Sequence, residues 1–357
     1  MFVGKFTDFY RDVTKKGTKI SQEEYKEIGS YPIIDQGKKL IAGRWDNREG
    51  VFDDVPAIIF GDHTRAIKYI EEPFFIGADG VKILRPTNAQ DSTKYLYYAL
   101  QAARIPNLGY SRHFKALKEL EIRVYSREEQ DEIVRVLDKI DHLIEQRYKE
   151  ISCLNQLVKS RFIELFGDPK YNKSNLVKIG EIGSLTSGGT PSRAKPEYFE
   201  GDIRWYSAGE LNSLYLPDSV EHISKTALQE SSAKLFNKGT LMIGMYDTAA
   251  FKLGILTENS SSNQACANLN PQNDYNVVWL YYLFDIMKPI FLQKRQGVRQ
   301  KNLSLSKIKE FEVPNAPIGI QNHFAAFVTQ VDKSKYCSQK FEELCRELIK
   351  IYEQEWI

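Results

Sequence analysis

The sequence predicts an α+β protein with a pseudo-two-fold internal repeat. It consists of two domains of mixed β-sheet and helix, separated by two long helices that form an antiparallel coiled coil. Three observations predict this class. A tyrosine-rich segment occurs as LYYAL at residues 96–100 and again as LYYLF at 280–284. A polar loop that opens at Gly109 recurs at Gly297. Each loop is followed by a strand-like run and then by a long amphipathic stretch, so one architecture is encoded twice.

The repeat divides the chain into four parts: a first domain at 1–126, a central helix at 127–167, a second domain at 168–319 and a C-terminal helix at 320–357. A length of 357 residues is enough for more than one hydrophobic core. The β-rich runs predict strands at 31–34, 57–60, 74–76, 81–84, 120–125, 203–207, 240–246, 252–256 and 308–314. The segments 95–100 and 279–284 are predicted as helices whose aromatic rings pack in a core rather than stack on bases.

The central helix carries a heptad seam, in which apolar residues recur at intervals of seven: Leu137, Ile144, Ile151, Val158 and Leu165. Gly167 and Pro169 end the helix, since glycine serves a left-handed cap and proline cannot continue a helix. A weaker seam runs along the last helix through Phe327, Val331, Phe341, Cys345, Leu348 and Tyr352. At 1.5 Å per residue each helix spans roughly 55 Å. The two helices are therefore expected to bury their stripes against each other, although pairing with other chains is an alternative.

Charge is distributed unevenly along the chain. Basic residues outnumber acidic ones by 20 to 17 in residues 1–125 and by 17 to 15 in 168–319, whereas acids prevail in both helices. Residues 92–118 and 286–309 occupy matching positions in the two copies, and both windows contain basic residues and no acid. A single basic window is usually a solvated surface. The same window in both copies indicates a surface that faces phosphates.

Several classes of protein are not supported by the sequence. No apolar run is long enough to span a membrane, and the first twenty residues do not resemble a signal peptide, so we expect a cytoplasmic protein without membrane contact. The four cysteines form no C-x-x-C pair and are expected to be buried thiols, with no metal bound. No phosphate-binding loop, nucleotide fingerprint or catalytic triad is evident, so we assign no catalytic residue.

Candidate DNA-contacting residues are basic or polar residues of the predicted loops and of the acid-free windows. In the first copy they are Lys16, Thr18, Lys19, Arg44, His63, Arg65, Lys68, Arg112, His113 and Lys115. In the second copy they are Thr190, Ser192, Arg193, Lys195, Tyr246, Lys294, Arg295, Arg299 and Lys301. Such side chains grip phosphates or hydrogen-bond to base edges.

The chain resembles the specificity (S) subunits of Type I restriction-modification systems. The resemblance rests on the repeat of domain plus long helix, the junction LVKSRFIELFGDP at 157–169, and the opening SGGTPS at 187–192 that leads to YFEGDIRW at 198–205. It covers essentially the whole chain. The first copy departs from the pattern because it has KKGTK at 15–19 where the second has the Gly-Gly-Thr-Pro loop.

The resemblance implies a sequence-specific, non-catalytic subunit whose two target recognition domains each bind one half of a bipartite double-stranded DNA site. It also implies two modification subunits that methylate adenine with S-adenosylmethionine, and motor-nuclease restriction subunits that join the complex. S-adenosylmethionine, ATP and Mg²⁺ would then bind the partner subunits, with no cofactor in this chain. The long helices would set the spacer between the half-sites. Two alternatives remain: a stand-alone nucleic-acid enzyme with a helical dimerisation arm, and a coiled-coil adaptor that does not bind DNA.

Overall fold

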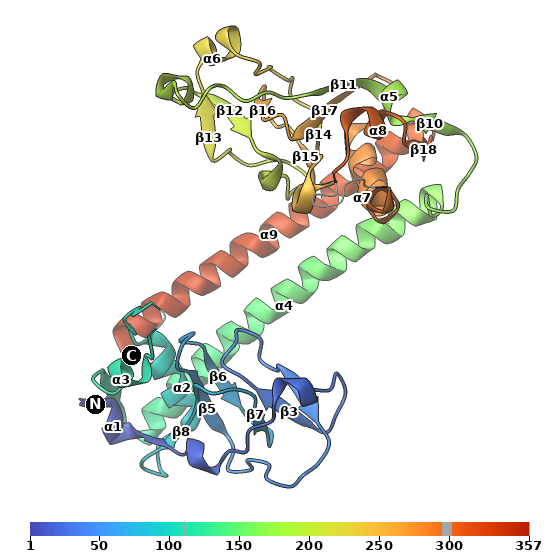
Figure 1. Cartoon of the computed structure of the whole chain (residues 1–357). Helices are drawn as coiled ribbons and strands as arrows, with labels where there is room; N and C mark the ends of the chain where they lie inside the picture. The colour runs from blue at the N-terminus through green and yellow to red at the C-terminus, as the bar shows by residue number, and fades with distance from the viewer. Residues whose placement is uncertain (110, 295–301, 357) are drawn as a thin grey trace. The chain divides into compact units, whose positions relative to one another are not determined.

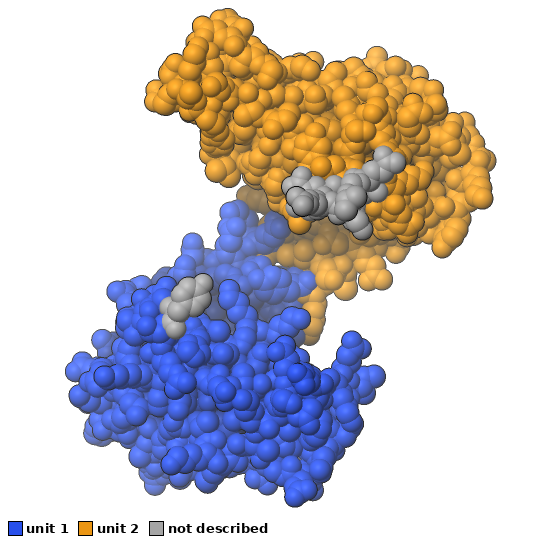
Figure 2. Space-filling model, in the orientation of Figure 1, with its two compact units in different colours: residues 1–148, 339–357 blue, residues 149–338 orange. Residues whose placement is uncertain are grey.

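The computed structural model describes residues 1–109, 111–294 and 302–356. The chain divides into two compact units: unit 1 comprises residues 1–148 and 339–357, and unit 2 comprises residues 149–338 (Figure 2). Each unit therefore contains one mixed α/β domain together with part of each long helix. The boundary between the units falls within both long helices, whereas the sequence predicted each long helix as a part of its own. The four-part division of the chain stays a prediction.

Unit 1 is built on three small sheets (Figure 1). An antiparallel four-stranded sheet has the order β2 (Tyr10–Asp12), β8 (Val81–Pro86), β5 (Ala57–Gly61), β6 (Ile67–Ile70). A three-stranded sheet has the order β4 (Gly43–Trp45), β3 (Tyr31–Ile34), β7 (Phe75–Ile76), and β1 (Phe2–Lys5) pairs with β9 (Glu121–Val124). The short helices are α1 (Phe6–Phe9), α2 (Thr93–Ala102) and α3 (Phe114–Leu117).

Unit 2 repeats the sheets of unit 1 strand by strand and adds one short helix, α6. Its four-stranded sheet has the order β11 (Gly183–Ser187), β17 (Cys266–Pro271), β14 (Leu241–Gly244), β15 (Leu253–Ile255). Its other sheets are β13 (Glu221–Ile223), β12 (Ile203–Tyr206), β16 (Ser261–Ser262), and β10 (Leu176–Lys178) with β18 (Glu312–Pro314). The helices are α5 (Ile179–Ile182), α6 (Lys225–Glu230), α7 (Val277–Gln293) and α8 (Leu305–Lys309). The strand pairings match, including a parallel pairing in each unit, β3 with β7 and β12 with β16.

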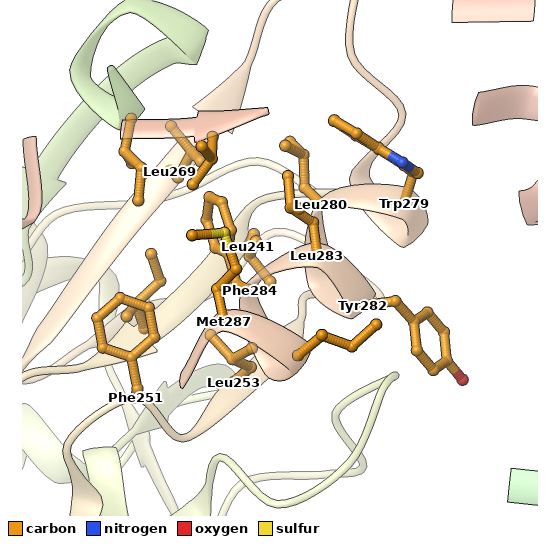
Figure 3. Close-up of a cluster of buried hydrophobic side chains, with 14 of the residues drawn as sticks. Leu241, Phe251, Leu253, Leu269, Trp279, Leu280, Tyr282, Leu283, Phe284 and Met287 are labelled. Atoms are coloured by element: carbon orange, nitrogen blue, oxygen red, sulfur yellow. The ribbon is translucent and has the colours of Figure 1, made fainter. Parts of the chain in front are cut away.

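Helices α2 and α7 begin in the same way and cover their sheets. The side chains of Ser92 and Asn276 accept hydrogen bonds from the first-turn backbone and so cap the two helices. The backbone N–H of each cap residue donates to a glutamine side chain of a long helix. Ser92 N donates to Gln130 at 2.7 Å, and Asn276 N donates to Gln321 at 2.8 Å. Figure 3 shows how α7 packs in unit 2: Leu280, Leu283, Phe284 and Met287 face the sheet, and Trp279 and Tyr282 lie on the other side.

The long helices are α4 (Arg127–Phe166) and α9 (Ile318–Trp356). Within unit 1 the Tyr148 hydroxyl donates to Glu342, and the Tyr125 and Trp356 rings lie 6.3 Å apart. Tyr148 follows Tyr125 along the chain, whereas its partner Glu342 precedes Trp356, so the two segments run in opposite directions. In unit 2 the two helices also pack together, with the Phe162 and Phe166 rings 5.3 Å and 5.8 Å from the Phe324 ring. In unit 1 the two helices pair antiparallel, as the pseudo-two-fold repeat predicted.

Several details of the sequence prediction need correction. Leu348 is 46% exposed, because the inward-facing position of the last turns is Ile349, which packs against the core of unit 1. Ile308 lies in helix α8 rather than in a strand, and the strand begins at Glu312. All four cysteines are free thiols, but Cys153 and Cys337 are exposed rather than buried, since they lie on the outer faces of the long helices.

No helix in the described part of the chain is long and apolar enough to cross a membrane.

Candidate nucleic-acid interface

In unit 1 a turn and a loop from the acid-free window meet at one end of the four-stranded sheet. The turn follows β5 and contains Asp62, whose backbone carbonyl accepts from His113 N at 2.8 Å and whose carboxylate accepts from Phe114 N at 2.7 Å. His113 Nε2 accepts from Leu108 N at 3.0 Å. The Nδ1 atom of His113 lies 2.9 Å from Asp62 O, so the ring links the loop before α3 to the turn after β5. We call the described residues of the turn (62–66) and of the loop (105–109 and 111–115) the turn–loop surface of unit 1.

Unit 2 has the same backbone connection between turn and loop, which we call the joint, but its side chains differ. Its turn follows β14 and its loop precedes α8; Leu303 N donates to Met245 O at 2.9 Å, which matches the His113 to Asp62 bond. Both side chains are buried, Met245 at 2% exposure and Leu303 at 0%. The turn–loop surface of unit 2 comprises the described residues 245–252, 294 and 302–304. The backbone joint is therefore retained, whereas its side chains are polar in unit 1 and apolar in unit 2.

The candidate residues of the unit 1 turn–loop surface separate by exposure. His63, Arg112 and Lys115 are exposed, and Arg112 approaches Asp62 only at 4.0 Å. Arg65 is half-buried, adopts a left-handed φ of 60° and donates to Ile105 O at 3.2 Å, so it links the turn to the loop.

Lys68 and His113 need correction as predicted DNA contacts. The Lys68 side chain is 4% exposed, and its Nζ donates to Asp35 O at 2.8 Å and contacts the Asp35 carboxylate at 3.3 Å. Burial lowers the pKa of Lys68, against the opposing effect of Asp35. His113 is 0% exposed. Because neither side chain reaches the surface, both support the candidate interface from beneath and do not contact a ligand directly.

A second candidate surface is the loop after the first strand of each four-stranded sheet, which we call the opening loop. It covers residues 14–20 in unit 1 and 187–195 in unit 2. The two loops are anchored alike, by Ile20 N on Ile76 O and by Gly189 N on Ser262 O, both at 2.9 Å. A Cβ on Gly189 would lie 2.1 Å from Ser232 O, so this close approach requires glycine. Lys16, Thr18 and Lys19 are exposed on the unit 1 loop, and Lys19 pairs with Asp79 at 2.8 Å.

The basic residues of the unit 2 opening loop are exposed but are held by carboxylates. Arg193 Nη2 donates to Glu221 at 2.7 Å, and the guanidinium lies 4.2 Å from the Phe199 ring centroid. The hydrogen bond to Glu221 raises the pKa of Arg193 and lowers that of Glu221. Lys195 donates to the Tyr198 hydroxyl at 2.6 Å and to the Glu230 carboxylate at 3.1 Å, and both bonds raise the pKa of the lysine. These cations are pre-positioned, but a phosphate would have to compete with their partners.

The other candidates are placed as follows. Ser192 is exposed, Thr190 is half-buried and bonded to the Gln264 side chain, and Arg44 is half-buried and donates to Gly29 O at 3.1 Å. Tyr246 and Lys294 are exposed on the turn–loop surface of unit 2. Arg295, Arg299 and Lys301 lie outside the described residues, so their predicted roles remain predictions from the sequence.

Two residues of unit 1 were missed at the sequence level. Asp62 is an acid that the sequence offers no reason to place beneath a basic loop, yet it is 2% exposed and holds that loop. Lys82 lies on β8, pairs with Asp12 at 3.1 Å and lies 4.7 Å from the Phe114 ring centroid. No pattern in the sequence indicated Lys82, because the strand does not alternate regularly between buried and half-buried residues.

Known proteins share both the sequence pattern and the fold. The family described as Type I restriction modification DNA specificity domain matches residues 7–152 and 171–344. The chain is 24% identical over 337 residues to the EcoR124I/EcoR124II specificity subunit of Escherichia coli, which covers 88% of this chain and 82% of that protein. It is 28% identical over 182 residues to the MjaIX specificity subunit of Methanocaldococcus jannaschii, which covers 48% of this chain and 42% of that protein.

Two solved structures have the same fold. The S subunit of a Type I restriction-modification system from M. genitalium aligns with a TM-score of 0.61 at 18% identity, over 99% of this chain and 94% of that one. A chain from a structural study of complex assembly in the type I R-M system aligns with a TM-score of 0.57 at 12% identity, over 99% and 96%. Since the family model matches both domains and most of both long helices, the chain belongs to the Type I restriction-modification DNA specificity family.

Proposed function

We propose that this protein is the subunit that gives a Type I restriction-modification complex its DNA sequence specificity, with one half of a bipartite target bound by each unit. The observation that carries the proposal is the repeat itself. The two units share strand order and strand pairing but differ in the side chains of the turn–loop surfaces and opening loops. A constant scaffold with variable loops suits two similar but different half-sites.

The charges of the candidate surfaces support DNA as the ligand. Exposed cations lie on the turn–loop surface of unit 1 at Arg112 and Lys115 and on that of unit 2 at Lys294. Cations of this kind bind phosphates and release counterions, which gives affinity that falls with salt. Base edges would be contacted by polar side chains of the same loops, such as Thr18 and Ser192. We propose that α4 and α9, which run through both units, set the spacer between the half-sites.

The partner subunits would bind the long helices. On α9 within unit 1, Leu344, Leu348 and Ile351 are about half exposed and recur at intervals of four and three residues. This spacing forms one apolar stripe, which suits helices of another subunit. We infer that two modification subunits use such stripes and that restriction subunits join through them.

Catalysis and cofactors would reside in those partners. S-adenosylmethionine for adenine methylation, and ATP with Mg²⁺ for restriction, are assigned by this proposal to the partner subunits and not to this chain. We also infer that the complex acts in the cytoplasm, where its DNA is. The enzyme alternative has less support, because the matched family is a DNA specificity domain, and a coiled-coil adaptor would not need the paired basic loops.

Co-expression tests the proposal. The chain is expressed with candidate modification subunits in a host lacking other adenine methyltransferases, and methylated adenines are mapped across the genome. We expect one bipartite motif with two defined halves and an undefined spacer. Divalent-ion-dependent cleavage of DNA by the purified chain alone would support the enzyme alternative. Absence of any motif, with no salt-dependent DNA binding by the assembled proteins, would support the adaptor.

A further inference from the structure

An apolar pocket of about 200 Å³ lies in unit 2 where α4 ends and α9 begins. Its walls are mainly aromatic and proline side chains: Phe162, Phe166, Pro169, Trp279, Pro317 and Ile320. None of its lining residues is a lysine or an arginine. The volume is of the order of a cavity that holds one benzene molecule, about 150 Å³.

The other copy shows what this position can hold. Gln130 and Gln321 are equivalent, since each accepts from a helix cap and donates to a backbone carbonyl five residues before it, Tyr125 O at 2.9 Å and Ala316 O at 2.6 Å. Tyr125 of unit 1 therefore corresponds to Ala316 of unit 2. In unit 1 the Tyr125 ring is 9% exposed and lies 6.4 Å from the Tyr95 ring and 6.3 Å from the Trp356 ring.

Unit 2 keeps the surrounding rings but lacks this one. Trp279 corresponds to Tyr95, because both follow the helix cap by three residues, and it lies 5.8 Å from Phe166. Ala316 supplies only a methyl group to the wall. Figure 3 shows Trp279 on the side of α7 turned away from Leu241 and Leu269, and its ring contacts Phe162 and Phe166 of α4. Its buried indole Nε1 has no hydrogen-bond partner among the described residues, whereas the Tyr95 hydroxyl donates to Arg123 O at 2.7 Å.

We propose that this pocket is a docking site for one aromatic side chain of a partner polypeptide, which takes the place that Tyr125 fills in unit 1. The partner is a protein rather than a nucleic acid, because the lining offers no cation to hold a phosphate. Aromatic anchors in apolar pockets commonly carry the affinity of protein interfaces. The inference rests on the proposed function, because the partner is a subunit of that complex.

The first test measures the pocket in the full chain alone. N-acetyl-L-tyrosinamide is titrated and followed by saturation-transfer NMR. Wild type binds it saturably, and Ala316→Tyr, which installs the ring of the other copy, loses this binding. Tyr125→Ala opens the equivalent position in unit 1 and gains a second site. Equal binding by wild type and Ala316→Tyr, or no binding by wild type, overturns the inference.

The second test measures docking in the complex. Ala316→Tyr is compared with Ala316→Ser, which leaves the pocket open, in quantitative co-purification with the modification subunits. We expect Ala316→Tyr to weaken assembly on the order of tenfold and Ala316→Ser to leave it unchanged. Melting of the isolated chain controls for folding, and Ala316→Tyr should not melt below wild type. Unaltered assembly with a filled pocket overturns the inference while the proposed function stands. Failure of the wild-type chain to assemble removes the proposed function itself.

Discussion

Units 1 and 2 have the same backbone hydrogen-bond pattern but build its joints from different side chains. Asp62 and His113 in unit 1 correspond to Met245 and Leu303 in unit 2. On β8 and β17 the apolar residue is in unit 1 and the polar one in unit 2. Ile83 of β8 corresponds to Asn268 of β17, which is 1% exposed and donates to the Ser262 hydroxyl. The topology is therefore retained by main-chain pairing and burial, and either polar or apolar contacts can complete it. This leaves the loops above each joint free to diverge.

The ends of the long helix pair should differ most in stability. Phe162 is 0% exposed and contacts Phe166, Trp279 and Phe324. Phe162→Ala should destabilise unit 2 by about 3–5 kcal/mol. Tyr352 is the counterpart in unit 1, because its ring lies against that of Trp356 four residues later, as Phe162 lies against Phe166. Tyr352 is partly exposed, so Tyr352→Ala should cost less. Hydrogen–deuterium exchange, resolved by unit, measures both effects. Equal losses would contradict the unequal burial of the two ends.

Substitutions in the joints beneath the turn–loop surfaces should cause the next largest losses of stability. Met245→Ala removes a buried side chain and should cost about 2–5 kcal/mol, whereas Asp62→Ala leaves Phe114 N without its acceptor and should cost about 1–3 kcal/mol. Combining Asp62→Met with His113→Leu copies the unit 2 joint into unit 1. The double variant should lose less stability than the sum of its single variants in denaturant unfolding. Additive losses would show that the two joints are not interchangeable.

The equivalent tyrosines Tyr98 and Tyr282 should respond differently to alkaline pH. The Tyr98 hydroxyl contacts Asp138 at 2.6 Å and Asp141 at 2.9 Å, and no such bond is found for Tyr282 within the described ranges. Burial, and then the bonds to the two aspartates, raise the pKa of Tyr98; burial, and then Asp332, raise that of Tyr282.

Because the raised pKa favours the neutral hydroxyl in the folded state, the stability that it contributes is present below the ordinary value near 10 and is lost as pH rises above it. Tyr98→Phe should cost about 1 kcal/mol at pH 7 and flatten the loss of stability above pH 10. Tyr282→Phe should cost less at pH 7. Urea unfolding at pH 7 and pH 10.5 measures this, and identical pH profiles for wild type and Tyr98→Phe would contradict it.

The smallest effects concern single exposed cations. Lys115→Ala in unit 1 and Lys294→Ala in unit 2 should each reduce the salt slope of DNA binding by about one, with all sequences weakened alike. Lys340→Ala serves as the control. Lys340 lies on α9 and pairs with Glu343, so this substitution should leave the salt slope unchanged. Fluorescence anisotropy across a salt series, with modification subunits present, gives the slopes. Unchanged slopes for both lysines would remove the two turn–loop surfaces from the interface.

The repeat could be predicted from the sequence because it lies in local signals: heptads, aromatic segments and acid-free windows. The helices at 127–166 and 318–356 follow from such periodicity. The prediction that Leu348 lies in the seam was wrong, because Ile349 is the residue that faces the core of unit 1. Which of the two adjacent residues faces inward depends on how α9 packs against the rest of unit 1. Lys68 and His113 were taken for surface cations because a sequence does not show burial. Asp62 was missed because its role comes from a bond to residue 113, far away along the chain.

The central claim is that each unit binds one half of the DNA target. Residues 170–315 are replaced by the corresponding domain of a related chain, the hybrid is co-expressed with the modification subunits, and methylated adenines are mapped across the genome. The account predicts a motif in which one half changes and the other half and the spacer stay as in the parent. A motif in which both halves change, or in which neither does, would contradict it.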